Sequence, residues 1–264
     1  MEKNKPTTPQ GRVKAKKWLG QHFLTDANIA RNIAESLQFR GSVLEIGPGM
    51  GMLTQFLLEN PEIDLKIIEI DAESCDYLLQ KYPQLENRLL NADFLQLQPT
   101  EIFPEAFAII GNFPYNISSQ ILFKVYEHPE FITEITGMFQ REVARRIVSP
   151  PGNKDYGILS VLLQTYYHCE YLFTVSETVF SPPPKVKSGV IRLTRKKNLP
   201  SDFPKELYTQ LVKAAFNQRR KTLRNALHGF QFRNLEAVEP WMGKRAEQLS
   251  YMDFLELTRQ VKTC

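Results

Sequence analysis

Three glycines follow a short apolar run in the stretch Val43-Leu44-Glu45-Ile46-Gly47-Pro48-Gly49-Met50-Gly51. The apolar residues predict a buried strand, and the residues after Gly51 predict a helix, so the glycines lie in a strand-to-helix turn. Glycine lets the backbone bend tightly there and approach a ligand, because no Cβ stands in the way. The stretch therefore predicts one unit of an open α/β sheet with a ligand site at the carboxyl ends of its strands.

Acidic residues end the next two predicted strands. Glu69 stands 22 positions after Gly47, where its carboxylate can accept hydrogen bonds from a ribose diol. Asp93 follows the third predicted strand and can accept a hydrogen bond from the exocyclic amine of a cofactor adenine. Each feature alone has a purely structural alternative, a tight turn or a solvated strand end. Together they indicate a nucleoside cofactor.

The spacing and charge of the glycine loop indicate which cofactor it binds. The loop reads G-x-G-x-G, and Met52 occupies the position of the third glycine in the dinucleotide fingerprint. Pro48 removes an amide donor from a pyrophosphate cradle, and Glu45 adds a negative charge. The loop therefore disfavours NAD and favours S-adenosylmethionine, which carries a positive centre and an α-amino group.

A repeated pattern of strands and helices surrounds the loop. It is typical of a parallel sheet with helices on both faces. Asp26 can cap a helix that begins directly after it and ends near Gly41. The residues from Phe173 to Leu193, interrupted by Ser181-Pro182-Pro183-Pro184, predict an antiparallel hairpin that closes the sheet. Further strands are predicted at 42–46, 65–70, 89–90, 108–110 and 136–139, and helices at 52–59, 73–81, 118–127, 142–148 and 156–167.

The fourth predicted strand leads into Asn112-Phe113-Pro114-Tyr115, which faces the cofactor's reactive end if ligands bind beyond the carboxyl ends of the strands. The Asn112 side-chain oxygen and the Pro114 carbonyl can each accept a proton of an exocyclic amine, and the Tyr115 ring can stack on a purine. Two acceptors outside the base plane favour a pyramidal nitrogen whose lone pair points at a sulfonium methyl, so no strong base is needed. A target base in a duplex would have to be flipped out. An ordinary turn is the alternative interpretation.

Positive charge is concentrated in two segments. Residues 185–233 carry a net charge of +11, from 13 Lys and Arg against two Asp and Glu, and residues 1–20 carry +5. Residues 21–184 carry −11. The asymmetry indicates contact with a polyanion, with nucleic acid as the leading candidate. A solvated helix face and a solubilising tail are the respective alternatives.

The chain changes character near residue 200. After Pro200 only helices are predicted, at 205–217, 222–228, 235–239 and 252–262. We place a boundary between Thr194 and Pro204. The predicted organisation is a basic, flexible arm over 1–17, an α/β domain over 18–198 and a small all-α domain over 199–264.

Several classes of protein are excluded by what the chain lacks. Cys75, Cys169 and Cys264 lie far apart without C-x-x-C spacing, so they predict neither a disulfide framework nor a zinc cluster. The four histidines have no ligand spacing, so no metal is expected. No apolar run approaches the roughly 20 residues of a membrane span, and the start lacks a secretory signal. We therefore expect a soluble, cytoplasmic protein without membrane contact, with monomer as the default state.

Six motifs, spread from about Lys17 to Leu257, resemble in order and spacing those of the small-subunit ribosomal RNA adenine dimethyltransferase family, the kasugamycin-sensitivity enzymes. The motifs are Gly20-Gln21-His22-Phe23-Leu24, Glu45-Ile46-Gly47-Pro48-Gly49, Gly111-Asn112-Phe113-Pro114-Tyr115-Asn116-Ile117-Ser118, Gln140-Arg141-Glu142-Val143-Ala144, Phe180-Ser181-Pro182-Pro183-Pro184-Lys185-Val186 and Phe216-Asn217-Gln218-Arg219-Arg220-Lys221-Thr222-Leu223-Arg224.

The resemblance implies a Rossmann-like class I methyltransferase with a mostly parallel seven-stranded sheet, a final antiparallel hairpin and a helical C-terminal domain. It implies S-adenosylmethionine-dependent N6,N6-dimethylation of two adjacent adenines in the 3′-terminal hairpin of 16S rRNA during 30S subunit assembly. The implied cofactor residues are Gln21, His22, Leu24, Gly47, Gly49, Gly51, Glu69, Asp93, Phe94 and Asn112. The implied target-adenine residues are Asn112, Pro114, Tyr115 and Phe180, and the implied RNA-binding residues are Lys185, Arg219, Arg220, Lys221 and Arg224.

Two other functions remain open from the sequence. One is the related large-subunit rRNA adenine methyltransferase of the macrolide-resistance type, against which the basic helix 216–224 and the loop 180–185 argue. The other is a non-catalytic assembly or RNA-binding factor on the same fold. Glu69, Asp93 and Asn112 argue against that second alternative.

Overall fold

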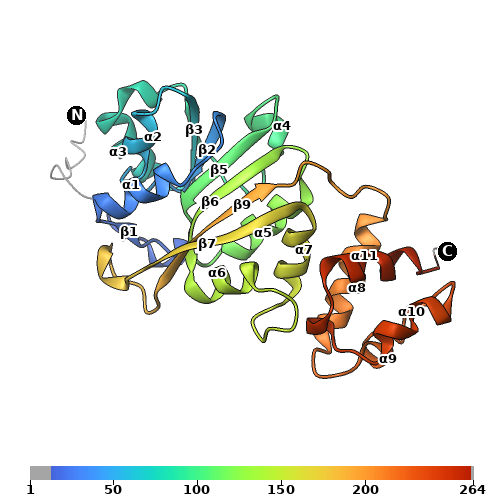
Figure 1. Cartoon of the computed structure of the whole chain (residues 1–264). Coiled ribbons are helices and arrows are strands. Elements are labelled where there is room, and N and C mark those ends of the chain that lie inside the picture. Colours follow the sequence, from blue (N-terminus) through green and yellow to red (C-terminus); the bar gives the residue numbers. More distant parts are fainter. Residues whose placement is uncertain (1–12, 263–264) are drawn as a thin grey trace, which may run out of the picture.

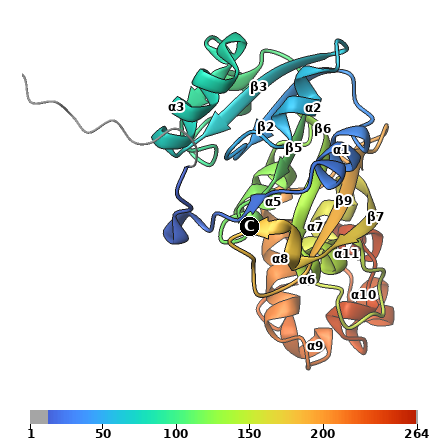
Figure 2. The same ribbon diagram turned by 90° about the vertical axis from the view of Figure 1, so that its left-hand side faces the viewer.

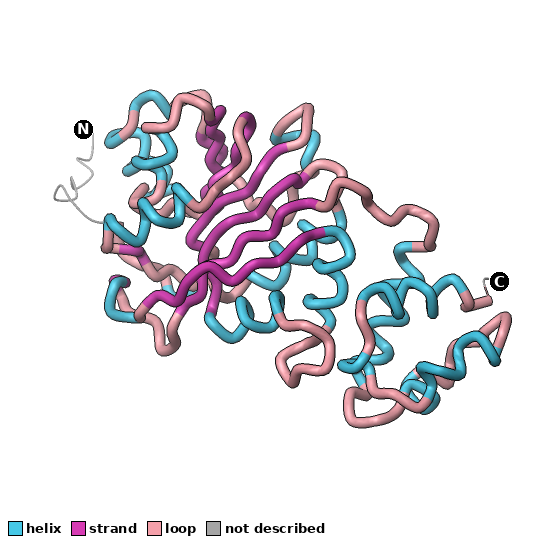
Figure 3. The backbone as a smooth tube through the Cα atoms, viewed as in Figure 1, coloured by secondary structure: helices cyan, strands magenta, loops and turns pink. Residues whose placement is uncertain are grey.

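A seven-stranded sheet forms the centre of the computed structural model, which describes residues 13–262 (Figure 1). Its strands are β2 (Gly41–Ile46), β3 (Ile63–Glu69), β4 (Leu89–Asn91), β5 (Phe107–Asn112), β6 (Ile132–Gln140), β7 (Tyr167–Val175) and β9 (Ser188–Arg195). They lie in the order β4-β3-β2-β5-β6-β9-β7. The first five in this order pair in parallel, and β9 pairs antiparallel with both of its neighbours. The predicted sheet with its antiparallel final hairpin is confirmed, and Figure 3 shows it as a twisted magenta layer.

Helices cover both faces of this sheet, because successive strand residues point to opposite sides. Val43 belongs to a core shared with α1 (Ala27–Glu35) and α2 (Thr54–Leu58). Leu44 belongs to a second core shared with α5 (Ser118–Glu127), α6 (Arg141–Val148) and α7 (Ile158–Tyr166). The predicted helices on both faces are therefore confirmed.

Local capping explains where α1 begins. The Asp26 carboxylate accepts hydrogen bonds from the backbone N–H groups of Asn28 and Ile29, at 2.9 and 3.1 Å. These bonds satisfy two of the donors that a helix start leaves unpaired. The predicted cap is confirmed, although α1 ends at Glu35, earlier than the predicted end near Gly41.

The C-terminal helices pack against the sheet's own helices. They are α8 (Lys205–Asn217), α9 (Leu223–Ala226), α10 (Leu235–Met242) and α11 (Tyr251–Arg259). Their buried residues form one hydrophobic cluster with α5 and α7. Two hydroxyl pairs reinforce this contact: Tyr126 with Thr209 at 3.0 Å, and Thr165 with Tyr208 at 2.7 Å. The all-α segment is as predicted, but because its core is continuous with that of the sheet, a separate domain starting at 199 stays a prediction.

Two short strands lie outside the main sheet, in a pairing that the sequence did not predict. The strands β1 (Phe23–Leu24) and β8 (Phe180–Ser181) pair antiparallel with each other as a small separate sheet. Two residues are too few to show the alternation that identifies a strand. Helix α4 (Pro99–Ile102), a single turn that begins with proline, was not predicted either. Helix α3 (Ala72–Lys81), in contrast, lies where a helix was predicted.

Candidate active site

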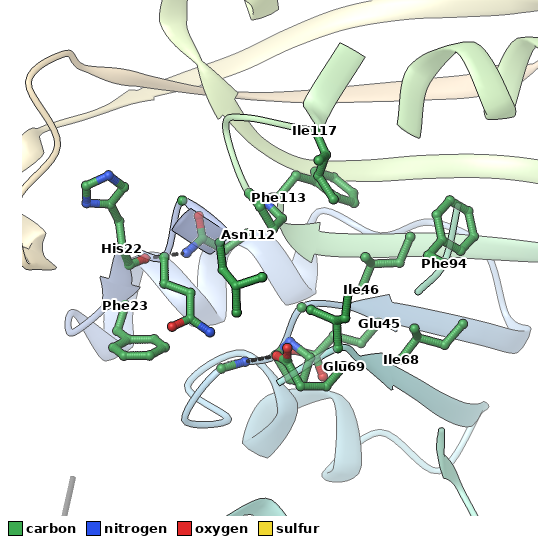
Figure 4. A pocket seen from close by; sticks show the side chains of 18 of the residues that line it. His22, Phe23, Glu45, Ile46, Ile68, Glu69, Phe94, Asn112, Phe113 and Ile117 are labelled. Atoms are coloured by element: carbon green, nitrogen blue, oxygen red, sulfur yellow. Dashed lines mark hydrogen bonds between the residues drawn. The ribbon is translucent and has the colours of Figure 1, made fainter. Parts of the chain in front are cut away.

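A cavity opens at the carboxyl ends of β2, β3 and β5, where an open α/β sheet places its ligand (Figure 4). Most of the cofactor and target residues predicted from sequence line it. They are Gln21, His22, Leu24, Gly47, Gly49, Glu69, Asp93, Phe94, Asn112, Pro114 and Tyr115. The topology thus brings together residues from five separate segments of the chain.

The glycine loop forms one wall of the cavity with left-handed backbone. Gly47 and Gly49 have φ values of 66° and 57°, which favour glycine. A Cβ on Gly49 would lie 2.8 Å from the Phe23 ring, so only glycine fits against this part of the chain. Gly51 does not line the cavity, and a Cβ on it would lie 2.8 Å from Leu78 and Tyr82. Gly51 therefore has a packing role against α3, and its predicted contact with the cofactor stays a prediction.

Glu69 is held in one orientation at the end of β3. Its carboxylate accepts hydrogen bonds from the backbone N–H group of Gly49, at 3.2 Å (Figure 4), and from that of Asp71, at 2.9 Å. Only 4% of the residue is exposed, and burial raises the pKa of the carboxyl against the effect of these bonds. A carboxylate has about four acceptor positions, so acceptor capacity remains for a diol.

Glu45 differs from what the sequence suggested. Its carboxyl is buried beneath the loop and accepts a hydrogen bond from the Thr54 hydroxyl at 2.7 Å. Burial raises the pKa of Glu45 to about 8. The group is therefore mostly neutral near pH 7, and the argument from its negative charge is wrong. The loop spacing and the missing amide of Pro48 still favour S-adenosylmethionine.

A buried lysine supports the end of the cavity that carries Asp93 and Phe94. Lys124 of α5 donates hydrogen bonds from Nζ to the carbonyl oxygens of Leu95, at 3.0 Å, and Leu97. The same ammonium lies 5.2 Å from the centroid of the Phe94 ring. Sequence reasoning missed Lys124, because a lysine within a helix pattern reads as a solvent-facing residue.

Asn112, the last residue of β5, has an amide group whose orientation is set by the chain. Its Nδ2 donates to the His22 carbonyl oxygen at 3.0 Å, which leaves Oδ1 as the acceptor (Figure 4). Tyr115 lies nearby, and its hydroxyl hydrogen-bonds the Ser188 hydroxyl at 2.5 Å. Burial raises the pKa of Tyr115, so the phenol is neutral. An amide oxygen and a neutral aromatic ring thus line the same part of the cavity.

The His22 ring points away from Glu69 in Figure 4, while its backbone contacts Asn112. Its Nδ1 lies 2.8 Å from the Pro182 carbonyl oxygen. A carbonyl can only accept, so Nδ1 is the donor. The ring centroids of His22 and Tyr115 are 5.6 Å apart. His22 therefore lines the cavity and also connects it to the proline-rich loop through Pro182.

Residues 13–24 are called the N-terminal strap below, and its second half, from Leu19 to Leu24, lines the cavity. Asp71, at the start of α3, binds the strap through an ion pair with Lys16 and a 3.3 Å hydrogen bond from Gln21 Nε2. Burial would raise the pKa of Asp71, but hydrogen bonds from Lys16, Gln21 and Ser74 lower it below its ordinary value. Val13 is also buried. The sequence assigned residues up to 17 to a flexible arm, whereas Val13 is buried and Lys16 is paired with Asp71. Residues 1–12 lie outside the described residues.

Two predicted target or RNA residues lie apart from the cavity. Phe180 is 4% exposed and packs in the hydrophobic core beside β1, so it does not line the cavity and its stacking on adenine stays a prediction. Lys185 is exposed in the loop that follows β8.

The predicted RNA-binding cluster after α8 divides into two kinds of residue. Arg219 donates to the Glu247 carboxylate at 2.7 Å and to the Lys154 carbonyl oxygen at 2.5 Å, and Arg224 pairs with Glu239 at 2.5 Å. Arg220 and Lys221 are exposed, and within residues 13–262 neither forms an ion pair. Arg219 therefore has a structural role that its sequence context did not reveal.

Two features are absent from residues 13–262. No group of three or more His, Cys, Asp and Glu side chains there could hold a metal ion. Among the same residues, none of the helices has the length and apolar character needed to cross a membrane.

Curated relatives resemble the chain over nearly its whole length. A protein of Cytophaga hutchinsonii named Ribosomal RNA small subunit methyltransferase A is 55% identical over 255 residues, 95% of this chain and 98% of that protein. A protein of the same name from Porphyromonas gingivalis is 56% identical over 254 residues, 94% of this chain and 97% of that protein.

Solved structures share the fold as well. A dimethyladenosine transferase from Plasmodium falciparum has a TM-score of 0.74 at 24% identity and covers 89% of this chain and 96% of its own. The 23S rRNA methyltransferase ErmE has a TM-score of 0.68 at 30% identity and covers 90% of this chain and all of its own, 100%. The Rossmann-like methyltransferase fold predicted from the sequence is confirmed. Residues 12–262 also match the family model described as Ribosomal RNA adenine dimethylase, and the chain therefore belongs to that family, as its motifs predicted.

Proposed function

We propose that this protein transfers methyl groups from S-adenosylmethionine to the N6 atoms of two adjacent adenines in the 3′-terminal hairpin of 16S rRNA, during assembly of the 30S subunit. The relatives named small subunit methyltransferase A from Cytophaga hutchinsonii and Porphyromonas gingivalis, at 55 and 56% identity, support this substrate. The observation that carries the proposal is the shared cavity: Glu69 and Asp93 line the same space as Asn112, Pro114 and Tyr115.

The residues of the cavity fit S-adenosylmethionine. The left-handed backbone at Gly47 and Gly49 leaves room for the cofactor to approach the loop closely. Glu69, fixed by two backbone N–H groups, would accept hydrogen bonds from the ribose hydroxyls, and Asp93 with the Phe94 ring would hold the adenine. The bound cofactor supplies an electrophilic methyl group on a sulfonium.

The chain's own groups orient the amine of the target base. Because Asn112 Nδ2 is committed to the His22 carbonyl, its Oδ1 is the atom that accepts one N6 proton. The Pro114 carbonyl already accepts the Ile117 N–H at 3.2 Å, and its second lone pair would accept the other N6 proton. Tyr115, fixed by Ser188, would stack on the base. The neutral phenol takes no proton, so the proton released after transfer passes to water.

A large-subunit substrate is a second candidate, because ErmE, whose structure is titled a 23S rRNA methyltransferase, is 30% identical over its whole length. The higher identity to the small-subunit relatives favours 16S rRNA. A non-catalytic factor would need none of the residues that orient the amine, so the presence of Asn112, Pro114 and Tyr115 in the cavity argues against it.

The test measures methyl transfer on defined particles. Purified protein with radiolabelled S-adenosylmethionine should methylate 30S particles from a strain that lacks the hairpin dimethylation, with up to four methyl groups per particle. Primer extension should stop at the two adenines after incubation with wild-type protein and not with Asn112→Ala. Methylation of 23S rRNA in preference to 16S rRNA would favour the second candidate. Cofactor binding without transfer to either RNA would favour a non-catalytic factor.

A further inference from the structure

The strap carries an exposed tryptophan that the proposed mechanism does not use. Trp18 is 75% exposed, and Leu235 and Met252, the next most exposed large apolar residues in the described part of the chain, both lie in the C-terminal helices at 70 and 61%. We propose that Trp18 is a stacking site for an unpaired base of the substrate RNA that flanks the target adenine, and that Lys17 and the groove beside Pro182 receive the adjoining backbone. This inference rests on the proposed function, because it concerns the same RNA.

The backbone of Trp18 is held at a defined place. Lys17–Leu19 form one turn of 3₁₀ helix, which Gly20 ends with a left-handed φ of 65°. The Gly20 N–H donates to the Lys17 carbonyl at 3.0 Å, and Lys16 is paired with Asp71. A ring on a fixed backbone loses little conformational freedom when a base stacks on it, which favours binding. In Figure 2 the dark-blue chain leaves the side of α3 and stands out from the body of the molecule at a short turn.

The fixed position of Trp18 is next to the site of methyl transfer. The Trp18 carbonyl oxygen accepts a hydrogen bond at 3.4 Å from Nδ2 of Asn116, the residue after Tyr115. The strap residues that directly follow Trp18, from Leu19 to Leu24, line the cavity together with Asn116. A base held on Tyr115 therefore has its neighbouring nucleotide at the rim where Trp18 lies. Proteins recognise unstacked RNA bases by stacking them on aromatic side chains.

A groove beside the cavity leads along the same rim. Its lining residues are Ala15, Lys17, Gly20, Gln21, His22 and Pro182. The hydrogen bond between His22 Nδ1 and the Pro182 carbonyl oxygen joins its two sides. The strap and the proline-rich loop that contains Pro182 thus form one surface, although His22 and Pro182 are 160 residues apart in the chain.

The exposed lysines of the strap and of the proline-rich loop suit a nucleic acid, and one of them, Lys17, lines the groove. Lys14 and Lys17 on the strap and Lys185 and Lys187 on the proline-rich loop are all exposed. Among residues 13–262 none of the four forms an ion pair. Unpaired lysines beside an aromatic ring match a backbone of phosphates that carries planar bases. An apolar protein partner would leave these ammonium groups without a counter-charge.

The test uses the fact that the chain has two tryptophans, Trp18 and Trp241. Trp241 is partly buried and donates to Asp253 at 3.0 Å. In a Trp241→Phe variant, Trp18 is the single source of tryptophan fluorescence. A synthetic RNA with the sequence of the 16S 3′-terminal hairpin should quench the emission of Trp18. Bound RNA should also protect the Trp18 ring from quenching by acrylamide. The same RNA with abasic sites on both sides of the two target adenines should bind without that quenching.

Substitutions then separate stacking from simple apolar contact. Trp18→Ala and Trp18→Leu should weaken binding of the hairpin RNA about tenfold, whereas Trp18→Phe, which keeps an aromatic face, should recover most of the affinity. Leu235→Ala is the matched control, because it removes a similarly exposed apolar side chain from a distant helix. S-adenosylmethionine should bind all four variants as it binds the wild type, since the Trp18 side chain does not line the cavity.

Four results would overturn the inference. They are hairpin binding by Trp18→Ala at wild-type affinity, quenching that persists with the abasic RNA, loss of cofactor affinity in Trp18→Ala, and weakened binding to whole 30S particles but not to the free hairpin. The third would show that the tryptophan only supports the strap, and the last would indicate a ribosomal protein as its partner. The proposed function fails separately, if wild-type protein methylates no 16S rRNA.

Discussion

The cofactor cavity and the basic segment 185–233 hold their charged groups in opposite ways. Glu69 in the cavity and Asp71 beside it are each 4% exposed and accept hydrogen bonds from backbone or side-chain donors. In the basic segment, Arg220 and Lys221 are exposed, and Arg224 pairs with Glu239 at the surface. Removing a buried polar group has a large effect, because its hydrogen-bond partners are left unsatisfied. An exposed group acts through its charge, which solvent screens and neighbouring charges can replace.

This difference predicts that single substitutions have large effects in the cavity and small, additive effects on the basic surface. Four experiments test it, in order of decreasing expected effect.

Asn112→Ala should lower turnover by roughly 10³-fold, because it removes the oxygen that holds the target amine in the geometry of transfer. S-adenosylmethionine affinity should stay within about tenfold of wild type, since other residues bind the cofactor. Asn116→Ala is the matched control, because Asn116 also donates its amide to a strap carbonyl. Methyl transfer to 30S particles and calorimetric cofactor titration measure the two effects. Equal losses in both variants would mean that Asn112 acts by holding the strap.

Glu45 makes stability depend on pH, since its pKa is raised by burial from 4.5 to about 8. Below pH 4.5 the carboxyl is protonated in both folded and unfolded states, so its contribution is fully present there. As the pH rises to 8 the unfolded state ionises first, and stability should fall by roughly 4 kcal/mol. Glu45→Gln, which can keep a bond with Thr54, should flatten this slope in urea unfolding at pH 5 to 8. An unchanged slope in the variant would contradict the assignment.

Lys124→Met should raise the dissociation constant for S-adenosylmethionine about tenfold, because the loop that carries Asp93 and Phe94 loses two hydrogen bonds to its carbonyls. Turnover at saturating cofactor should change less. Lys66→Met is the matched control: its ammonium also donates to a carbonyl, that of Ile102, and lies over the Phe103 ring, but outside the cavity. The idea fails if both variants bind the cofactor equally well.

Arg220→Ala combined with Lys221→Ala should weaken RNA binding several-fold at low salt and reduce the slope of affinity against salt concentration by about 2. Arg219→Ala should instead lower the thermal midpoint, because Arg219 joins Glu247 to the Lys154 backbone. Filter binding in a salt series and thermal unfolding separate the two roles. A salt slope that the double variant leaves unchanged would place the RNA elsewhere.

The sequence predicted the elements of the sheet and much of the site, because both depend on local patterns. Strands and helices repeat with characteristic periods, and Gly47, Glu69 and Asn112 each stand where a strand ends. Residues at strand ends meet at one edge of a parallel sheet, so their neighbourhood follows from the order of elements. The two-residue strand β1 shows no such period and was missed, and Phe180, which lay in the predicted hairpin, pairs with β1 instead.

Other features depend on contacts between residues distant in the chain, and only the tertiary structure decided them. Burial raises the pKa of Glu45, and Lys124 reaches a loop 27 to 29 residues earlier in the chain. Lys16 finds Asp71 at a separation of 55 residues, and Trp18 comes to lie beside the cavity because Asn116, 98 residues away, binds its carbonyl. The sequence thus determined which chemical groups stand at the strand ends. Packing of distant segments decided which of those groups are charged, which are held in place and which face solvent, because burial and partners arise only when the chain is folded.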